Sequence, residues 1–295
     1  MRANPHLAGI GFGLLAYGIW GFFPLFFRQL AHVPPMDVLS NRAVWACVFV
    51  GLLLTLGGGW SKVAAVFRAP RQLAMLALAA LLVGSNWLMF LWAVANQQVV
   101  ASSLGYFLTP LVNVVLGLVV LKERLNRLEW IAVGLALAAI VNEVITLGSL
   151  PWVSLFLAAT FGTYGLVRKQ VPVDALSGLW LETLAMLPLC GIYALWMAQT
   201  GHTVFAGHDP STATLLVGAG IITALPLMAF AAATQRLDLA TVGMLMYINP
   251  TMQFVTAVWI FGEPLQTARL VSFALIWLGL FVFSWSMWEK YRDRG

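Results

Sequence analysis

Charge is the property that this sequence has least of. Charged residues make up 9% of its 295 residues, whereas 61% are hydrophobic and the mean hydropathy is +0.89. A typical soluble domain carries about 25% charged residues, so this chain cannot cover a globular surface with well-solvated groups. Apolar runs of about 18 residues or more, long enough to cross a bilayer core of about 30 Å, recur along it. The composition therefore indicates a polytopic membrane protein that contacts the lipid bilayer.

Cysteine and the usual chemical motifs are scarce as well. Cys47 and Cys190 both lie inside apolar runs, where they are expected to be small packing residues. No phosphate-binding loop with Gly-Lys-Ser/Thr is present, so ATP-driven transport is not expected, and no cofactor or metal is predicted. His202, His208 and Asp209 share one connection without metal-ligand spacing, which predicts a solvated connector. The net charge is +5, and the basic residues lie between the apolar runs. Their positions are explained better by the orientation of the chain in the membrane than by nucleic-acid binding.

Ten membrane spans are predicted, joined by short connections rich in turn residues. They are approximately Leu7–Leu30, Met36–Leu56, Arg71–Ala95, Ala101–Leu121, Leu128–Thr146, Pro151–Val167, Leu176–Met197, Ala213–Ala233, Thr241–Phe261 and Thr267–Trp288. With a cytoplasmic amino terminus, thirteen of the sixteen Lys and Arg residues lie on the cytoplasmic side, and the others are Arg28, Arg42 and Arg269. Because cytoplasmic loops are enriched in Lys and Arg, both termini are predicted to be cytoplasmic.

The second half of the chain repeats the design of the first half. Pro110 and Pro250 are 250 − 110 = 140 residues apart, and Glu123 and Glu263 are 263 − 123 = 140 residues apart. Each pair lies in a long apolar run with the proline in its interior and the glutamate near its end. The same shift aligns Arg28 with Arg168 and Phe90 with Phe230, which indicates a duplicated architecture.

The two halves, residues 1–146 and 147–295, are expected to cross the membrane in opposite directions. Each half holds five predicted spans, an odd number, and the charges of equivalent loops agree with the inversion. The loop with Lys62 and Arg68 corresponds to residues 197–211, which contain no Lys or Arg. The predicted fold class is therefore an all-α polytopic membrane protein with ten transmembrane helices arranged as two inverted five-helix repeats. Such repeats can exchange conformations around a midplane site, which is the physical basis of many secondary transporters.

Several short motifs, spread over almost the whole chain, resemble one family. They are Ala16-Tyr17-Gly18-Ile19-Trp20-Gly21, Ser40-Asn41-Arg42-Ala43, Asn86-Trp87, Ser103-Leu104-Gly105-Tyr106-Phe107 with Thr109-Pro110-Leu111-Val112-Asn113, and Tyr164-Gly165-Leu166-Val167-Arg168-Lys169. With them the sequence resembles the RarD branch of the EamA transporters, in the drug/metabolite transporter superfamily. The resemblance implies a ten-helix inner-membrane exporter with a central cavity. Related amino-acid and metabolite exporters, YddG-type proteins among them, imply that substrate class by analogy, and the branch label implies a link to chloramphenicol sensitivity.

The proline-containing spans carry the main candidate site. Proline has no N–H to donate, so Pro110 leaves the carbonyl of Tyr106 without its helical partner, and that group then needs another partner or a wet cavity. Two interpretations are open: a pair of kinked helices that line a substrate path, or packing kinks satisfied by neighbouring helices. The candidate gate residues are Pro110 and Pro250, and the candidate substrate-path residues are Tyr17, Trp20, Asn86, Tyr106, Thr109, Asn113, Tyr164, Tyr247, Asn249 and Gln253.

Three charges are predicted to lie within the membrane, where ionisable residues are functional candidates. Arg42 and Glu182 each lie six residues into their spans, about 9 Å at about 1.5 Å per residue, but they enter from opposite sides. Their depths therefore argue against a direct ion pair. Glu143 is the better depth match for Arg42, whereas Glu182 is expected near Arg168 or Lys169. A topology-locking charge and a substrate or proton role remain alternatives for each.

These features favour a secondary exporter of small polar or amphipathic metabolites, with amino acids, aromatic ones among them, as the leading substrate class. A multidrug/proton antiporter is the alternative, with protons as coupling partners. A membrane enzyme should show clustered catalytic residues at one membrane face, and none stands out, so the chain is not expected to be an enzyme. A channel should show a continuous polar stripe through several spans, whereas the polar positions here are sparse.

Overall fold

The computed structural model describes residues 5–120, 122, 125–207, 209–234, 236–237 and 245–292. Within these ranges all regular structure is helical. The elements are α1 (Pro5–Gly21), α2 (Phe23–Arg28), α3 (Pro35–Gly57), α4 (Trp60–Phe67), α5 (Pro70–Ala95), α6 (Val99–Val120), α7 (Arg127–Leu147), α8 (Trp152–Lys169), α9 (Ala175–Ala198), α10 (Pro210–Thr234), α12 (Ile248–Val255), the π-helical η1 (Thr256–Ile260) and α13 (Thr267–Arg292).

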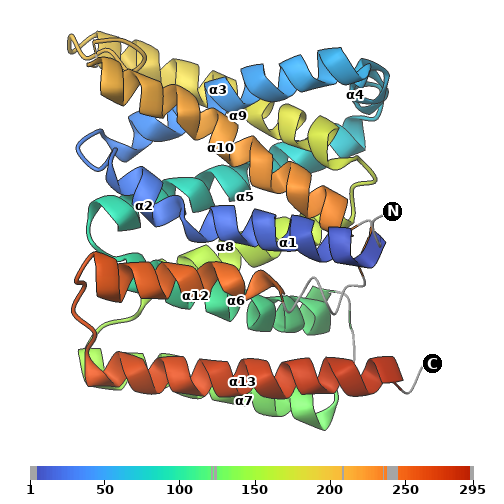
Figure 1. Cartoon of the computed structure of the whole chain (residues 1–295), viewed down its shortest axis with the longest axis vertical. Coiled ribbons are helices and arrows are strands. Elements are labelled where there is room, and N and C mark those ends of the chain that lie inside the picture. The colour runs from blue at the N-terminus through green and yellow to red at the C-terminus, as the bar shows by residue number, and fades with distance from the viewer. Residues whose placement is uncertain are drawn as a thin grey trace.

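The long helices run roughly perpendicular to the longest axis of the molecule and stack along that axis (Figure 1). The pair α7 and α13 forms one extreme of the stack, and α3, α9 and α10 form the other. The first helix begins and the last helix ends at the same edge, which we call the terminal end. The opposite edge, called the distal end, carries the connections 29–34, 96–98, 148–151, 199–207 and 261–266.

Eight helical segments of the described chain are long and apolar enough to cross a membrane. They are His6–Arg28, Pro35–Gly57, Pro70–Ala95, Val99–Val120, Arg127–Thr146, Ala175–Ala198, Pro210–Phe230 and Arg269–Ser286. The prediction of an all-helical, multi-pass membrane protein is therefore confirmed. The sixth predicted span corresponds to α8. The ninth corresponds to α12 followed by η1, and its first residues, 241–244, lie outside the described part of the chain.

Two local features differ from the sequence prediction. The first predicted span was continuous, but a turn at Phe22 divides it into α1 and α2. Pro24 explains the break, because it cannot donate a hydrogen bond to the carbonyl of Trp20. The connection after Gly57 contains the unpredicted helix α4, which buries Val63 and Val66. Before it, Gly58 takes the left-handed conformation (φ 66°) that glycine adopts without steric cost at a helix end.

A close helix contact positions α6 against α8. A Cβ atom on Gly105 would lie 2.7 Å from the carbonyl oxygen of Ser154, so only glycine lets the two backbones approach this closely. The hydroxyl of Ser154 donates to the carbonyl of Ala101 at 2.7 Å, which fixes the same crossing. Small residues commonly allow such close helix contacts in membrane proteins. The first half of α6 is therefore held firmly between its neighbours.

Candidate substrate path between the proline-containing helices

The two proline-containing helices, α6 and α12, pack against each other, and side chains hydrogen-bond across the contact. The hydroxyl of Ser102 donates to Gln253 Oε1 at 3.1 Å, and the hydroxyl of Ser103 donates to the carbonyl of Pro250 at 2.9 Å. The amide of Gln253 in turn donates to Asn249 Oδ1 at 2.8 Å. The predicted path residues Gln253 and Asn249 therefore lie at a joint between the two halves of the chain.

The distal end of this joint is closed by Glu263. Its two carboxylate oxygens accept from the backbone N–H groups of Val99 and Val100, each at 2.8 Å, and the residue is 6% exposed. These are among the donors that a helix leaves unpaired at its first turn, where a negative charge is also favourable. We call this pair of bonds the Glu263 cap. Glu123, its counterpart in the sequence repeat, lies outside the described residues.

Residues of the joint that are related by the 140-residue repeat differ in exposure. Gln253 is buried at 2% exposure, whereas its counterpart Asn113 is exposed, and Tyr247 and Asn249 are half-buried. Thr109, one turn nearer the distal end than Asn113, is buried and donates to the carbonyl of Gly105 at 3.3 Å. The polar groups of the joint are therefore tightly enclosed toward the distal end and more accessible toward the terminal end.

Asn86 lies at a junction of α5, α6 and α8. Its amide nitrogen donates to the carbonyl of Leu157 at 3.0 Å and to the hydroxyl of Thr160 at 2.9 Å. Its carbonyl oxygen accepts from the hydroxyl of Tyr106 at 3.1 Å. Both amide hydrogens are thus in use, and the residue is fully buried. The geometry makes Asn86 the connector that orients Tyr106, while Tyr106 itself is half-buried.

Aromatic side chains line both flanks of the joint. On one flank the rings of Tyr17 and Trp20 from α1 meet Phe230 of α10 at centroid distances of 6.1 and 5.9 Å. On the other flank Phe161 of α8 contacts both Tyr106 and Tyr164 at 5.9 Å. Tyr17 is buried, and Trp20 and Tyr164 are half-buried. The sequence prediction of aromatic path residues thus falls on two clusters that border α6 and α12.

Two of the three predicted intramembrane charges form ion pairs. Glu182 lies 3.2 Å from Arg168 Nε and accepts from the hydroxyl of Tyr164 at 3.2 Å. The guanidinium of Arg168 packs over Gly178, where a Cβ atom would lie 2.5 Å from it. The expectation that Glu182 lies near Arg168 is confirmed, whereas nothing is described for the side chain of Lys169.

The expected contact between Arg42 and Glu143 is wrong. Glu143 of α7 lies 3.7 Å from Arg269 Nε of α13, on the far side of the helix stack from α3. Depth in the membrane carries no information about which helices are neighbours. Arg42 instead donates from Nε to the hydroxyl of Thr223 in α10 at 2.6 Å.

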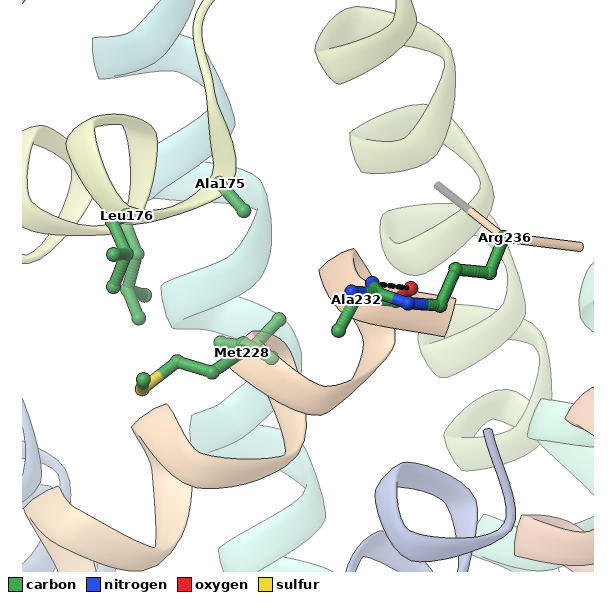
Figure 2. A pocket seen from close by; sticks show the side chains of 7 residues that line it. Ala175, Leu176, Met228, Ala232 and Arg236 are labelled. Atoms are coloured by element: carbon green, nitrogen blue, oxygen red, sulfur yellow. Dashed lines mark hydrogen bonds between the residues drawn. The ribbon is translucent and has the colours of Figure 1, made fainter. Parts of the chain in front are cut away.

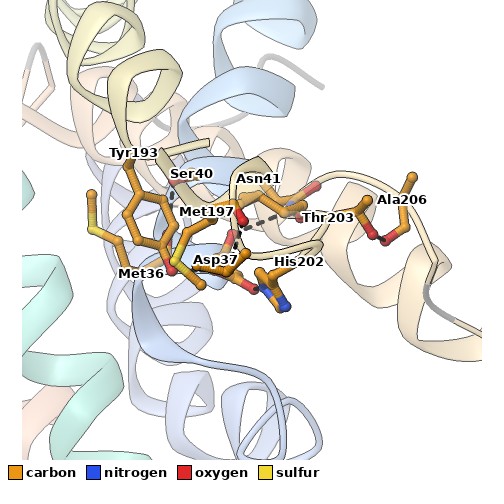
Figure 3. Close-up of polar contacts among 11 residues, drawn as sticks. Met36, Asp37, Ser40, Asn41, Tyr193, Met197, His202, Thr203 and Ala206 are labelled. Carbon is orange, nitrogen blue, oxygen red and sulfur yellow. Dashed lines mark hydrogen bonds and ion pairs between the residues drawn. The ribbon is translucent and has the colours of Figure 1, made fainter. Parts of the chain in front are cut away.

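The connection before α10 was predicted to be a solvated connector, but it contacts buried residues of α3. His202 Nε2 lies 2.6 Å from Asp37 Oδ2, and the hydroxyl of Tyr193 donates to the other carboxylate oxygen at 2.6 Å (Figure 3). Asn41 donates to the carbonyls of Asp37 and Val204 at 3.0 and 2.9 Å. Asp37 is fully buried at the start of α3. Sequence reasoning missed this cluster because Asp37 and Asn41 contact residues more than 150 positions away. His208 lies outside the described residues.

A cavity of about 280 Å³ opens between α9 and α10 toward the terminal end (Figure 2). Its lining is apolar apart from one arginine and consists of Ala175, Leu176, Leu179, Leu227, Met228, Ala232 and Arg236. Arg236 donates to the carbonyl of Ala232 at 2.8 Å. None of the predicted path residues lines this cavity, so it is separate from the joint of α6 and α12.

Comparison with known proteins gives a consistent family. Residues 7–142 match the model of the EamA-like transporter family. The chain is 40% identical to the protein RarD of Escherichia coli, covering 96% of each chain, and 44% identical to an uncharacterized transporter of Pseudomonas aeruginosa, covering 96% of this chain and 95% of the relative. It is 36% identical to the uncharacterized transporter YojE of Bacillus subtilis, covering 96% of each chain. A crystal structure shares the fold with a TM-score of 0.59 at 20% identity, over 96% of this chain and 98% of that chain.

Proposed function

The chain belongs to the RarD branch of the EamA-like transporter family, and on this basis we propose that it is a secondary transporter that exports small metabolites, amino acids foremost. Membership of this family makes it a multi-pass membrane protein with a small-molecule substrate. The proposal adds the substrate class, the direction, and a mechanism of alternating access between two inverted repeats. The contact between α6 and α12 is the observation that carries it.

The pattern of helix contacts supports two five-helix repeats, residues 1–146 and 147–295. In the order of the predicted spans, α1 corresponds to α8, α3 to α9, α5 to α10, α6 to α12 and α7 to α13. Replacing each helix by its counterpart converts the contact of α1 with α10 into that of α8 with α5. The same exchange converts α6–α8 into α12–α1 and α3–α10 into α9–α5, and all of these contacts occur. The pairs α3–α9, α6–α12 and α7–α13 map onto themselves. A pseudo-twofold relation of this kind is what inverted repeats require.

The joint of α6 and α12 supports alternating access through its uneven closure. Its distal part is held by the Glu263 cap and by hydrogen bonds from Ser102 and Ser103, whereas Asn113 toward the terminal end is exposed. If the two repeats exchange conformations, the distal contacts open while the equivalent contacts at the terminal end form. Pro110, inside α6, and Pro250, in the first turn of α12 just after the turn at Tyr247, then lie at the hinge, where the chain resists bending less.

The charge distribution supports an inner membrane protein with both termini cytoplasmic. Thirteen of the sixteen Lys and Arg residues fall on the cytoplasmic side in this orientation, as the positive-inside rule requires. The terminal end then faces the cytoplasm and the distal end faces outward. The more accessible side of the joint is therefore the side from which an exporter takes its substrate.

We propose that transport is driven by one of three sources: the substrate gradient, the proton gradient or the membrane potential. The membrane potential is worth about 2.3 kcal/mol per charge per 100 mV. One observation favours a second candidate, a multidrug/proton antiporter: the carboxylate of Glu182 is buried at 2% exposure beside Tyr164 and Arg168. A buried carboxylate is a common proton carrier in transporters. A relative from Pseudomonas aeruginosa, 32% identical, is named chloramphenicol-sensitive protein RarD.

Counterflow in proteoliposomes tests the proposal. Vesicles loaded with one unlabelled compound at high concentration are diluted into a trace of the same labelled compound, and the panel covers amino acids, nucleosides and chloramphenicol. A transporter gives a transient accumulation of label, because the outward flow of unlabelled substrate reorients the carrier. A channel gives no accumulation. If folded protein exchanges drugs but no amino acid, the antiporter replaces the amino-acid exporter, and exchange of no compound contradicts both.

A further inference from the structure

Arg42 stands apart from the other intramembrane charges in how it is surrounded. It lies in the second turn of α3 with only 2% of its surface exposed. Its guanidinium carbon lies 4.0 Å from the ring centroid of Trp87, 5.2 Å from that of Phe27 and 5.4 Å from that of Phe23. These rings cover the faces of the guanidinium with weakly attractive, apolar surface. The hydrogen-bonding edge of the group is left to find other partners.

The edge of the guanidinium is incompletely satisfied. Arg42 Nε donates to the hydroxyl of Thr223 at 2.6 Å, and this hydroxyl itself donates to the carbonyl of Ala219 at 2.7 Å. Arg42 Nη1 is buried and has no hydrogen-bond partner. Thr223 therefore fixes the direction of the guanidinium while leaving one of its terminal nitrogens unused.

No carboxylate compensates this charge within the part of the chain that the structure describes. Arg168 and Arg269, which lie at helix ends and are more exposed than Arg42, each lie within 4 Å of a glutamate oxygen, at 3.2 and 3.7 Å. Charged groups inside proteins are normally paired, because an uncompensated charge loses its hydration without gaining a counter-ion. Arg42 is thus a buried and oriented arginine with one unused donor nitrogen and no carboxylate partner among the described residues.

We propose that Arg42 is the receptor for the carboxylate of the transported substrate, an inference that rests on the proposed function and narrows its substrate class. The planar guanidinium matches a carboxylate through two parallel hydrogen bonds, a geometry that a neutral or cationic substrate does not offer. The surrounding rings of Phe23, Phe27 and Trp87 suit an apolar side group. The site therefore fits small carboxylates with an apolar or aromatic substituent, and amino acids of this kind meet both requirements.

Aromatic contacts connect this site to the joint of α6 and α12. The ring of Phe90 lies 6.5 Å from Phe23, 6.1 Å from Phe27 and 6.2 Å from Tyr106 on α6. Trp87 and Tyr106 are half-buried, whereas Arg42 is buried behind these rings. Movement of α6 during alternating access would therefore open or close the way to the guanidinium.

The test compares acids with their amides in the counterflow assay. Each labelled amino acid is challenged with unlabelled amino acid or with the corresponding amino-acid amide, which keeps the side chain and amine but lacks the carboxylate. In the wild type the acid is expected to compete at least tenfold better than the amide. Arg42→Gln should remove this preference and reduce exchange of acids more than that of amides. Thr223→Val, which removes only the orienting hydroxyl, should raise the KM for acids more than it lowers the maximal rate.

A double variant, Arg269→Gln with Glu143→Gln, is the matched control. It removes an ion-paired arginine together with its carboxylate, and it should keep the wild-type preference for acids. Equal competition by acids and amides in the wild type overturns the proposal even if Arg42→Gln does not fold, and so does an unchanged preference in folded Arg42→Gln. In both cases exchange itself persists, so the proposed transporter function stands. Absence of any exchange by the wild type contradicts the proposed function instead.

Discussion

The Glu263 cap offers a direct way to open the distal end. Glu263→Ala removes both carboxylate oxygens and leaves the N–H groups of Val99 and Val100 without these acceptors. The bonds join the connection before α13 to the first turn of α6, and therefore join the two proposed repeats. In a state with an open distal end the cap is already broken, so the substitution should destabilise the closed state alone.

The magnitude follows from the geometry. Hydrogen bonds to charged groups contribute about 1.5–3 kcal/mol, and the charge at a helix amino terminus adds about 0.3–1 kcal/mol. Water can reach the freed N–H groups once the side chain is removed, so we take a net loss of about 2 kcal/mol. At about 1.4 kcal/mol per factor of ten, this shifts the equilibrium between closed and open states about 30-fold. Glu263→Gln keeps one acceptor oxygen and should give a smaller shift.

Cysteine labelling measures that shift. Ser102 is fully buried in the joint, and Ser102→Cys is nearly isosteric. It is placed in a chain whose native cysteines, Cys47 and Cys190, are replaced by alanine. A membrane-impermeant maleimide is added from the outer side of oriented vesicles. Because the thiol reacts only when the distal end opens, Glu263→Ala should raise the labelling rate about 30-fold.

A matched control separates opening of the joint from general instability. Glu129 forms a capping box with Asn126 at the start of α7, entirely within one half. Glu129→Ala removes a comparable cap and should lower the thermal stability without accelerating the labelling of Cys at position 102. The reasoning is refuted if Glu263→Ala remains folded and labels no faster than its parent, or if Glu129→Ala accelerates labelling to the same degree.

Three further predictions concern packing, the path and pH. Gly105→Ala should lower the free energy of unfolding by about 1–3 kcal/mol through overpacking, as measured by thermal denaturation. Gly134→Ala should not, because nothing lies within 4 Å of a Cβ atom there. Equal effects of the two substitutions would refute the close approach of α6 and α8. Gln253→Ala should reduce transport per folded molecule at normal expression, and unchanged transport would remove this residue from the path. Hydrogen bonds from the Ser211 side chain and from Thr212 hold the pKa of Asp209 well below its usual range. The stability advantage of wild type over Asp209→Asn should therefore be present at neutral pH and shrink as the pH falls below the ordinary aspartate pKa, and a constant melting-temperature difference would contradict this.

The helices were predictable from the sequence because each apolar run must satisfy its own backbone in the membrane. The predicted spans overlap the observed helices, and the two proline-containing spans do meet. Pro110 lies inside α6 as predicted, whereas Pro250 lies in the first turn of α12, because a turn at Tyr247 precedes that helix. The break at Phe22 was also within reach, since Pro24 is visible in the sequence. These features can be predicted because they depend on local properties of the sequence: hydrophobicity, the length of the apolar run and the N–H group that proline lacks.

The partners of the polar residues were not predictable in the same way. Glu263 reaches Val99 across 164 residues, and Arg42 reaches Thr223 across 181. Sequence reasoning gave Arg42 the wrong partner, because the neighbours of a helix and its rotation about its axis are set by packing. The same limitation hid the cluster around Asp37. One signal for Arg42 was available in the sequence. It is an arginine in an apolar span with no glutamate at helical spacing, which indicates that it has no ion-pair partner on its own helix.

Paired distance measurements test alternating access most directly. One pair of spin labels at Asn96 and Gln266 spans the distal end, and a second pair at Arg127 and Arg236 spans the terminal end; all four residues are exposed. With a substrate that gives counterflow, a population with a longer distal distance should appear together with a population with a shorter terminal distance, and Glu263→Ala should enlarge both. Distances that stay fixed at both ends during active exchange, or that lengthen at both ends together, would contradict the account.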